Sequence, residues 1–379
     1  MKIIALADLH FGNPRIDSEE LYQKLRHSLY PELGTAHLVF VAGDLYDQLL
    51  TVNSKAYKFA ALFMYDLMNI SAKTGMQVRL LHGTFSHDRD QIEIFETAKI
   101  PQSNFKVINQ ITCEEISNLR TGNNTVAKKL KVGYIPDNLS YRTSDEVLIH
   151  LKREMEILNW KELDLVIGHG AFDHVLRIDK EHKPLTLYSI SQFQPITPHG
   201  LVIMGHIHTP SHAKNVYYCG SFDRMAHNEE ESKGYYSFTF DHNTWRAQFH
   251  VNTQATLFNT ITLQGDDIEI LIQSFLDQVN QKFPTKRGYV RVVHANPEVR
   301  AMLHRICSQE FPELHYSSKS SQDTPAVEIK VDEVTLDVVN DVLPDEKNIA
   351  SLVYQYLEDR QLLDQISQQA IAQKISALL

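Results

Sequence analysis

Residues 2–12, KIIALADLHFG, combine a short apolar run with two metal-capable side chains. The run is long enough for one buried strand, and it stops at Asp8-Leu9-His10 followed by Gly12. In an Asp-x-His segment both polar side chains point to the same side of an extended backbone, because side-chain direction alternates along a strand. A buried strand that ends in a carboxylate and an imidazole is typical of a ligand site at the edge of a sheet.

Four later apolar runs, at 38–42, 77–82, 163–168 and 201–204, end in a similar way. They finish in Gly43-Asp44, in Gly83 followed by His87-Asp88, in Gly168-His169-Gly170, and in Gly205-His206-Ile207-His208. Helical periodicity at 18–30, with Ser18 as N-cap, and at 53–70 separates the first runs, which predicts an α/β sheet. Because carboxyl ends of parallel strands meet at one edge, these groups are expected to form one site for two cations. Mixed imidazole and carboxylate ligation suits Mn, Fe or Zn better than Mg alone.

Composition excludes several classes of protein. The chain has 379 residues, of which 43% are hydrophobic and 22% charged, so it is neither disordered nor fibrous. A net charge of -10 argues against a protein that coats nucleic acid through bulk positive potential. Three scattered cysteines, the absence of any apolar run of about 20 residues and the lack of a signal-peptide pattern predict a cytoplasmic protein with no membrane segment.

The chain is expected to divide into residues 1–257, residues 258–335 and residues 336–379. The first part also contains a predicted hairpin turn at 120–127, a helix at 143–158 and a strand pair at 234–251. The second reads as a small α+β domain, with helices at 267–282 and 297–310, strands at 288–294 and 326–331, and a polar loop at 317–323. The third is a helical tail whose residues 345–379 contain no Gly or Pro, and it could dock on a partner or fold back on the chain.

The order of these motifs resembles the calcineurin-like metallophosphoesterases. Asp8-Leu9-His10-Phe11-Gly12 and Lys233-Gly234-Tyr235 are similar to the SbcD branch, the nuclease subunits of SbcCD-type DNA repair complexes. The resemblance covers roughly residues 1–250 and implies a four-layer αββα core, with residues 258–335 as a capping domain.

The resemblance also implies a role for each residue of the site. Asp8, His10 and His208 would hold one metal, and Asp44 would bridge to a second, completed by His169 and His206. His87 would be the catalytic histidine, with Asp88 orienting its ring. The family usually has Gly-Asn-His-Asp, whose Asn ligates the second metal, but this chain has no Asn there. Ser86 precedes His87, and its hydroxyl or a water is expected to replace the amide.

The function expected from this resemblance is a DNA nuclease that uses two divalent cations. Mn²⁺ is favoured, with Mg²⁺, Fe²⁺ or Zn²⁺ as alternatives. It would act as a 3'-5' exonuclease on duplex ends and an endonuclease on single strands or hairpins, as a homodimer with an SbcC-like coiled-coil ATPase in DNA repair or recombination. Two other readings stay open: a phosphatase or phosphodiesterase of a small phosphoester, and a non-catalytic DNA-end-binding scaffold.

Two further positions have two possible roles each. Asp47 is either a support for a metal ligand or a structural ion-pair partner. Arg291 with His294 either contacts phosphate or belongs to an ordinary strand.

Overall fold

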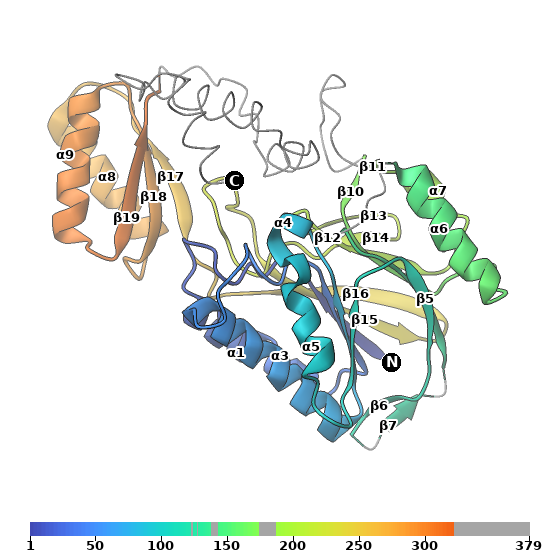
Figure 1. The fold of residues 1–379 in the computed structure, drawn as a ribbon. Helices are drawn as coiled ribbons and strands as arrows, with labels where there is room; N and C mark the ends of the chain where they lie inside the picture. The colour runs from blue at the N-terminus through green and yellow to red at the C-terminus, as the bar shows by residue number, and fades with distance from the viewer. Residues whose placement is uncertain (123, 127, 138–142, 174–186, 322–379) are drawn as a thin grey trace, which may run out of the picture. The chain divides into compact units, whose positions relative to one another are not determined.

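The chain has a mixed α/β fold with two six-stranded sheets (Figure 1). The structure is a computed structural model, and it describes residues 1–122, 124–126, 128–137, 143–173 and 187–321. The first sheet has the order β16-β15-β1-β2-β3-β4, in which β1 to β4 are parallel and β15 pairs antiparallel with both β1 and β16. Its strands are β1 (Lys2–Leu6), β2 (Leu38–Ala42), β3 (Gln77–Leu81), β4 (Asn104–Ile108), β15 (Gly234–Asp241) and β16 (Thr244–Val251).

The second sheet has the order β13-β14-β12-β9-β8-β5, and its four inner strands are parallel. Its strands are β5 (Thr112–Ile116), β8 (Leu130–Ile135), β9 (Leu165–His169), β12 (Leu201–Gly205), β13 (Ser211–Ala213) and β14 (Val216–Tyr218). Two short pairs lie outside both sheets, β6 (Leu119–Thr121) with β7 (Asn124–Val126) and β10 (Ala171–Phe172) with β11 (Leu187–Tyr188). The segment expected to be one turn between β5 and β8 therefore contains a small hairpin of its own.

Alternation along β1 explains how the two sheets pack. Ile3 and Ala5 belong to an apolar core that also contains Leu165 and Ile203 of the second sheet. Ile4 and Leu6 point the other way, into a core shared with the helices that follow β1 and β2. Because every residue of β2 is buried, this strand contributes to both cores, as expected for the centre of a parallel sheet.

Helices cover the sheet faces that the sheets do not cover for each other. On the first sheet lie α1 (Ser18–Ser28), α2 (Tyr30–Leu33) and α3 (Lys55–Thr74), and the helices of the second sheet are α6 (Ser144–Ile157) and α7 (Ile190–Phe193) (Figure 1). Three short helical segments follow β3, namely α4 (Phe85–Asp88), the 3₁₀ helix η1 (Arg89–Glu93) and α5 (Ile94–Thr97). The expected N-cap of α1 was wrong by one residue, since the Asp17 carboxylate accepts the N–H groups of Glu19 and Glu20.

Residues 258–319 form a small subdomain with its own apolar core. Three parallel strands, β17 (Phe258–Thr262), β18 (Gly288–Val293) and β19 (Leu314–Lys319), pack against α8 (Ile268–Lys282) and α9 (Pro297–Glu310). The polar loop expected at 317–323 was wrong in its first part, because residues 317–319 pair in β19. The strand expected at 326–331 and the helical tail at 336–379 lie outside the described residues.

The central position of β18 changes how its polar residues are interpreted. His294, directly after this strand, is 4% exposed, and its two ring nitrogens bond the carbonyl of Gly265 and the N–H of Asn296. His294 is thus a structural residue of the small subdomain rather than a phosphate contact.

No helix within the described ranges has both the length and the apolar character needed to cross a bilayer.

Candidate metal centre

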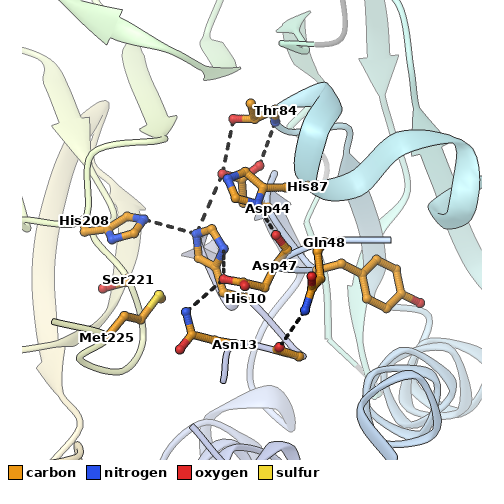
Figure 2. Close-up of polar contacts among 12 residues, drawn as sticks. His10, Asn13, Asp44, Asp47, Gln48, Thr84, His87, His208, Ser221 and Met225 are labelled. Carbon is orange, nitrogen blue, oxygen red and sulfur yellow. Dashed lines mark hydrogen bonds and ion pairs between the residues drawn. The ribbon is translucent and has the colours of Figure 1, made fainter. Parts of the chain in front are cut away.

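The polar residues expected at the strand ends do converge. Within each of three groups of residues the ligand atoms lie within 4.8 Å of one another, and His10 and Asp44 each belong to two of the groups. Figure 2 shows His10, Asp44, His87 and His208. We call Asp8, His10 and His208 the first group and Asp44, His169 and His206 the second group; the third consists of His10, Asp44 and His87. The three groups contain seven residues, and the strand-end pattern of the sequence named each of them as a metal or catalytic residue. They come from both sheets.

The backbone at these strand ends is held in an unusual conformation. Asp8, His10, Asp44 and His206 have φ angles of 52°, 49°, 52° and 86°, in the left-handed region that L-residues rarely adopt. Backbone hydrogen bonds keep two of these turns in place, because the N–H groups of Leu9 and His10 both donate to the Asp44 carbonyl, at 2.9 and 3.1 Å. Such strain is concentrated at functional sites, where it turns side chains toward a ligand.

Glycines allow the two sheets to approach each other at the site. A Cβ on Gly205 would lie 2.2 Å from the carbonyl oxygen of Ala42 and 2.7 Å from Nδ1 of His169. A Cβ on Gly83 would lie 2.1 Å from the Asp44 nitrogen. These distances are far inside van der Waals contact, so the close packing of the strand ends depends on the missing side chains.

The first group contains two imidazoles whose Nε2 atoms face each other. The Nε2 atoms of His10 and His208 lie 3.1 Å apart (Figure 2). The Nδ1 of His10 lies 3.2 Å from Asp47 Oδ1, and that of His208 lies 2.8 Å from Glu229 Oε1. The carboxylate of Glu229 accepts a hydrogen bond, so it places the ring proton of His208 on Nδ1 and leaves its Nε2 with a lone pair. That lone pair faces His10 Nε2 beside the Asp8 carboxylate, so a cation bound between the two rings would find donor atoms on both sides.

Asp47 therefore lies beside a candidate ligand, which favours the first of its two expected roles. Asn13 donates to the same oxygen, at 2.9 Å, and so fixes the carboxylate against His10 (Figure 2). Burial raises the pKa of Asp47, but its hydrogen bond and charge interaction with His10 outweigh this and leave the pKa below its ordinary value.

In the second group, Asp44 and His169 form a close buried pair. Nε2 of His169 lies 3.1 Å from Asp44 Oδ2, and its Nδ1 lies 2.8 Å from the Ala42 carbonyl. Burial lowers the pKa of His169, but the charges of Asp44 and Asp8 overcome this and raise it to about 10. For His206, burial and the nearby charge of His169 lower the pKa to about 3. A divalent cation held here would take the place of the His169 proton, because metal ligands must be deprotonated.

The hydroxyl next to the second group belongs to Thr84, not to Ser86. Thr84 Oγ1 lies 3.3 Å from both Asp44 Oδ2 and His169 Nε2, and its N–H donates to Asp44 Oδ1 at 2.7 Å. The Ser86 hydroxyl is buried and has no hydrogen-bond partner within the part of the chain that the structure describes. Within the described residues, Ser86 thus makes no hydrogen bond to the ligand groups, and its role as a ligand stays a prediction. Thr84 directly follows Gly83, as Asn follows Gly in the Gly-Asn-His-Asp motif of the metallophosphoesterases. Counting forward from Gly83 would have pointed to Thr84, whereas counting back from His87 pointed to Ser86.

The role expected for Asp88 also changes. Its carboxylate is fully buried and accepts the backbone N–H groups of Gly83, Asp44 and Tyr46, at 2.8, 3.0 and 3.1 Å. The Nδ1 of His87 instead lies against the Asp47 carbonyl. Asp88 therefore fastens the ends of β2 and β3 together, and the orientation of His87 comes from the backbone of the Asp47 loop.

Comparison with known families does not add to this picture, since no family model matches the chain and no curated protein matches it.

Proposed function

We propose that this chain is a metal-dependent phosphodiesterase that cleaves DNA, built on the four-layer αββα core of the metallophosphoesterases. The observation that carries the proposal is the convergence of the Nε2 atoms of His10 and His208 beside the Asp8 carboxylate, a set of donor atoms that one cation would join. The second group lies beside it and shares Asp44 with the His87 group. Two cores that place helices outside two packed sheets support the αββα assignment.

The donor set supports two divalent cations with Mn²⁺ as the favoured ion. It combines the carboxylates of Asp8 and Asp44 with four imidazoles, a mixture that suits Mn²⁺, Fe²⁺ or Zn²⁺ better than Mg²⁺. Divalent cations held there would act as Lewis acids on a phosphoester and lower the pKa of a water molecule. Asp44 has two carboxylate oxygens and belongs to two of the three groups, so it is the residue suited to bridge them.

His87 is positioned to act on the phosphoester itself. Its ring lies 4.8 Å from the ring of His10 in an edge-on arrangement, and its side chain is 5% exposed. It would stabilise charge on the phosphoryl group or give a proton to the departing oxygen, work that typically contributes about 10²–10⁴-fold to a rate.

DNA as substrate, the SbcC-like ATPase partner and the homodimer are proposed from the motif resemblance. The net charge of -10 fits a subunit that grips DNA through bound cations and a partner rather than through basic patches. On this reading the chain acts on duplex ends and on single strands or hairpins, in the cytoplasm.

The test is cleavage of end-labelled linear duplex and of single-stranded circular DNA by the purified chain. The reactions contain Mn²⁺, Mg²⁺ or a chelator, and an aryl phosphodiester is assayed in parallel. His87→Ala should abolish cleavage, whereas His242→Ala should match the wild type, because the His242 side chain is exposed and pairs with Asp241 away from the ligand groups. Turnover of the aryl diester without DNA cleavage would favour a small-phosphoester enzyme. Binding of DNA ends without turnover of either substrate would favour a scaffold.

A further inference from the structure

A buried set of charges lies behind His208, on the side away from His10. It consists of Glu229, Glu231 and Lys233, which we call the Lys233 cluster. The Lys233 side chain is fully buried, and its Nζ donates to Glu231 Oε1 and to the His208 carbonyl, both at 2.8 Å. Nζ also lies 3.1 Å from Glu229 Oε2. A buried ammonium needs such partners, because an uncompensated charge is strongly destabilising.

Glu229 is held so that one of its oxygens is available to the imidazole. Oε2 faces Lys233 and accepts the N–H of Met225 at 3.2 Å, while Oε1 lies 2.8 Å from His208 Nδ1. The segment 227–233 contains no helix or strand, so these contacts fix the carboxylate rather than a repeating backbone.

The cluster contains one more carboxylate than a structural ion pair with Lys233 requires. Glu231 alone would neutralise the ammonium, and it is the more exposed of the two, with 30% of its side chain accessible against 11% for Glu229. Burying a second carboxylate is costly unless it has its own partner. That partner is the Nδ1–H of His208, whose Nε2 then points its lone pair at the first group.

We propose that Glu229, held in place by Lys233, is a positioning residue that fixes the tautomer and ring orientation of His208 for cation binding. The inference rests on the proposed metal centre and adds a residue to it that no strand-end motif contains. Loss of such an outer partner typically weakens metal affinity about 10–100-fold. The effect should fall on one of two ions, because the second group has no contact with Glu229.

The experiment is a calorimetric titration of Mn²⁺ into the metal-free full chain, for the wild type, Glu229→Gln and Glu231→Gln. Glutamine keeps the shape of the side chain and removes its charge. We expect two ions per wild-type chain and, in Glu229→Gln, one of them bound about 10–100-fold more weakly. Glu231→Gln is the matched control, since Glu231 contacts Lys233 and Thr209 but not the imidazole, and it should bind both ions as the wild type does.

A second measurement reads the protonation of the wild type directly and needs no metal; a variant serves only to assign the signal. Nitrogen-15 spectra of the metal-free wild type, with His208 assigned through His208→Asn, report which ring nitrogen carries the proton. A proton on Nδ1 supports the proposal, and a proton on Nε2 overturns it. Equal Mn²⁺ affinities in wild type and Glu229→Gln would also overturn it. A wild type that binds no Mn²⁺ would instead remove the metal centre itself, so the two failures are distinguishable.

Discussion

Gly43→Ala tests whether close approach of the strand ends builds the metal centre. Gly43 has φ +90°, and a methyl group there would lie 2.2 Å from His169 Nδ1 and 2.7 Å from the Gly83 Cα. The left-handed backbone costs an alanine about 1–2 kcal/mol, and forcing a methyl group into packed surroundings costs about 1–3 kcal/mol more. We therefore expect the free energy of unfolding to fall by about 2–5 kcal/mol.

The site should change together with the stability. His169 must move, because its Nδ1 occupies the space of the new methyl group, and its bond to the Ala42 carbonyl would be lost. Binding at the second group should weaken while the first group keeps its ion. Urea unfolding of the metal-free chain gives the stability, and Mn²⁺ calorimetry gives the number of ions bound.

Gly34→Ala is the matched control for this substitution. Gly34 is exposed at the end of α2 with φ -61°, and a Cβ there would meet nothing within 4 Å. The same chemical change should be harmless or stabilise by about 0.4–1 kcal/mol, because it restricts the unfolded chain. If both alanine variants were equally stable and bound the same number of ions, the argument from close approach would be refuted.

Three further substitutions test individual polar groups. Thr84→Val should weaken Mn²⁺ binding at the second group by about 1 kcal/mol, roughly fivefold, whereas Thr84→Ser should not; calorimetry showing equal affinities would contradict the role given to this hydroxyl. Tyr46→Phe should raise the free energy of unfolding by about 1–2 kcal/mol, because the Tyr46 hydroxyl is buried with no partner among the described residues. Tyr22→Phe should lower the free energy of unfolding, because it removes the hydrogen bond to Asp66. The reverse order of stabilities in urea unfolding would refute this. Glu114→Gln should lower stability at neutral pH by about 1.5–3 kcal/mol. Burial raises the pKa of Glu114, but the two-pronged ion pair with Arg79 outweighs it and lowers the pKa, so this stabilisation is present above the ordinary glutamate pKa and is lost as pH falls. As pH falls, the free energy of unfolding should therefore decrease less in Glu114→Gln than in the wild type. Parallel curves of unfolding free energy against pH would count against a stabilising ion pair between Glu114 and Arg79.

The ligand residues could be predicted because each of them ends an apolar run. Asp8 and Asp44 stand two residues after a buried strand and His169 closes one, and parallel strands bring their ends to one edge. Distance in the sequence then matters little, so residues from 8 to 208 could be assigned to one site before the structure was known.

The supporting residues could not be predicted in the same way. Glu229 and Asp88 act through contacts with Nδ1 of His208 and with backbone N–H groups, and neither contact has a sequence spacing of its own. The choice between Ser86 and Thr84 shows a different limit of sequence reasoning. Three residues lie between Gly83 and His87, two more than in the Gly-Asn-His-Asp motif. Counting from the histidine therefore selects Ser86, while the strand end itself selects Thr84.

The position of β1 in its sheet has a consequence for how the protein folds. β1 lies between β2, which follows within the first 42 residues, and β15, which begins only at Gly234. A growing chain therefore carries one open edge of its central strand until nearly two hundred further residues have been added after β2. Pairings of such long range form slowly, and an open apolar edge invites pairing with other chains. Synthesis past β15, and not the appearance of the last metal ligand, is the step at which the N-terminal strand becomes protected from aggregation.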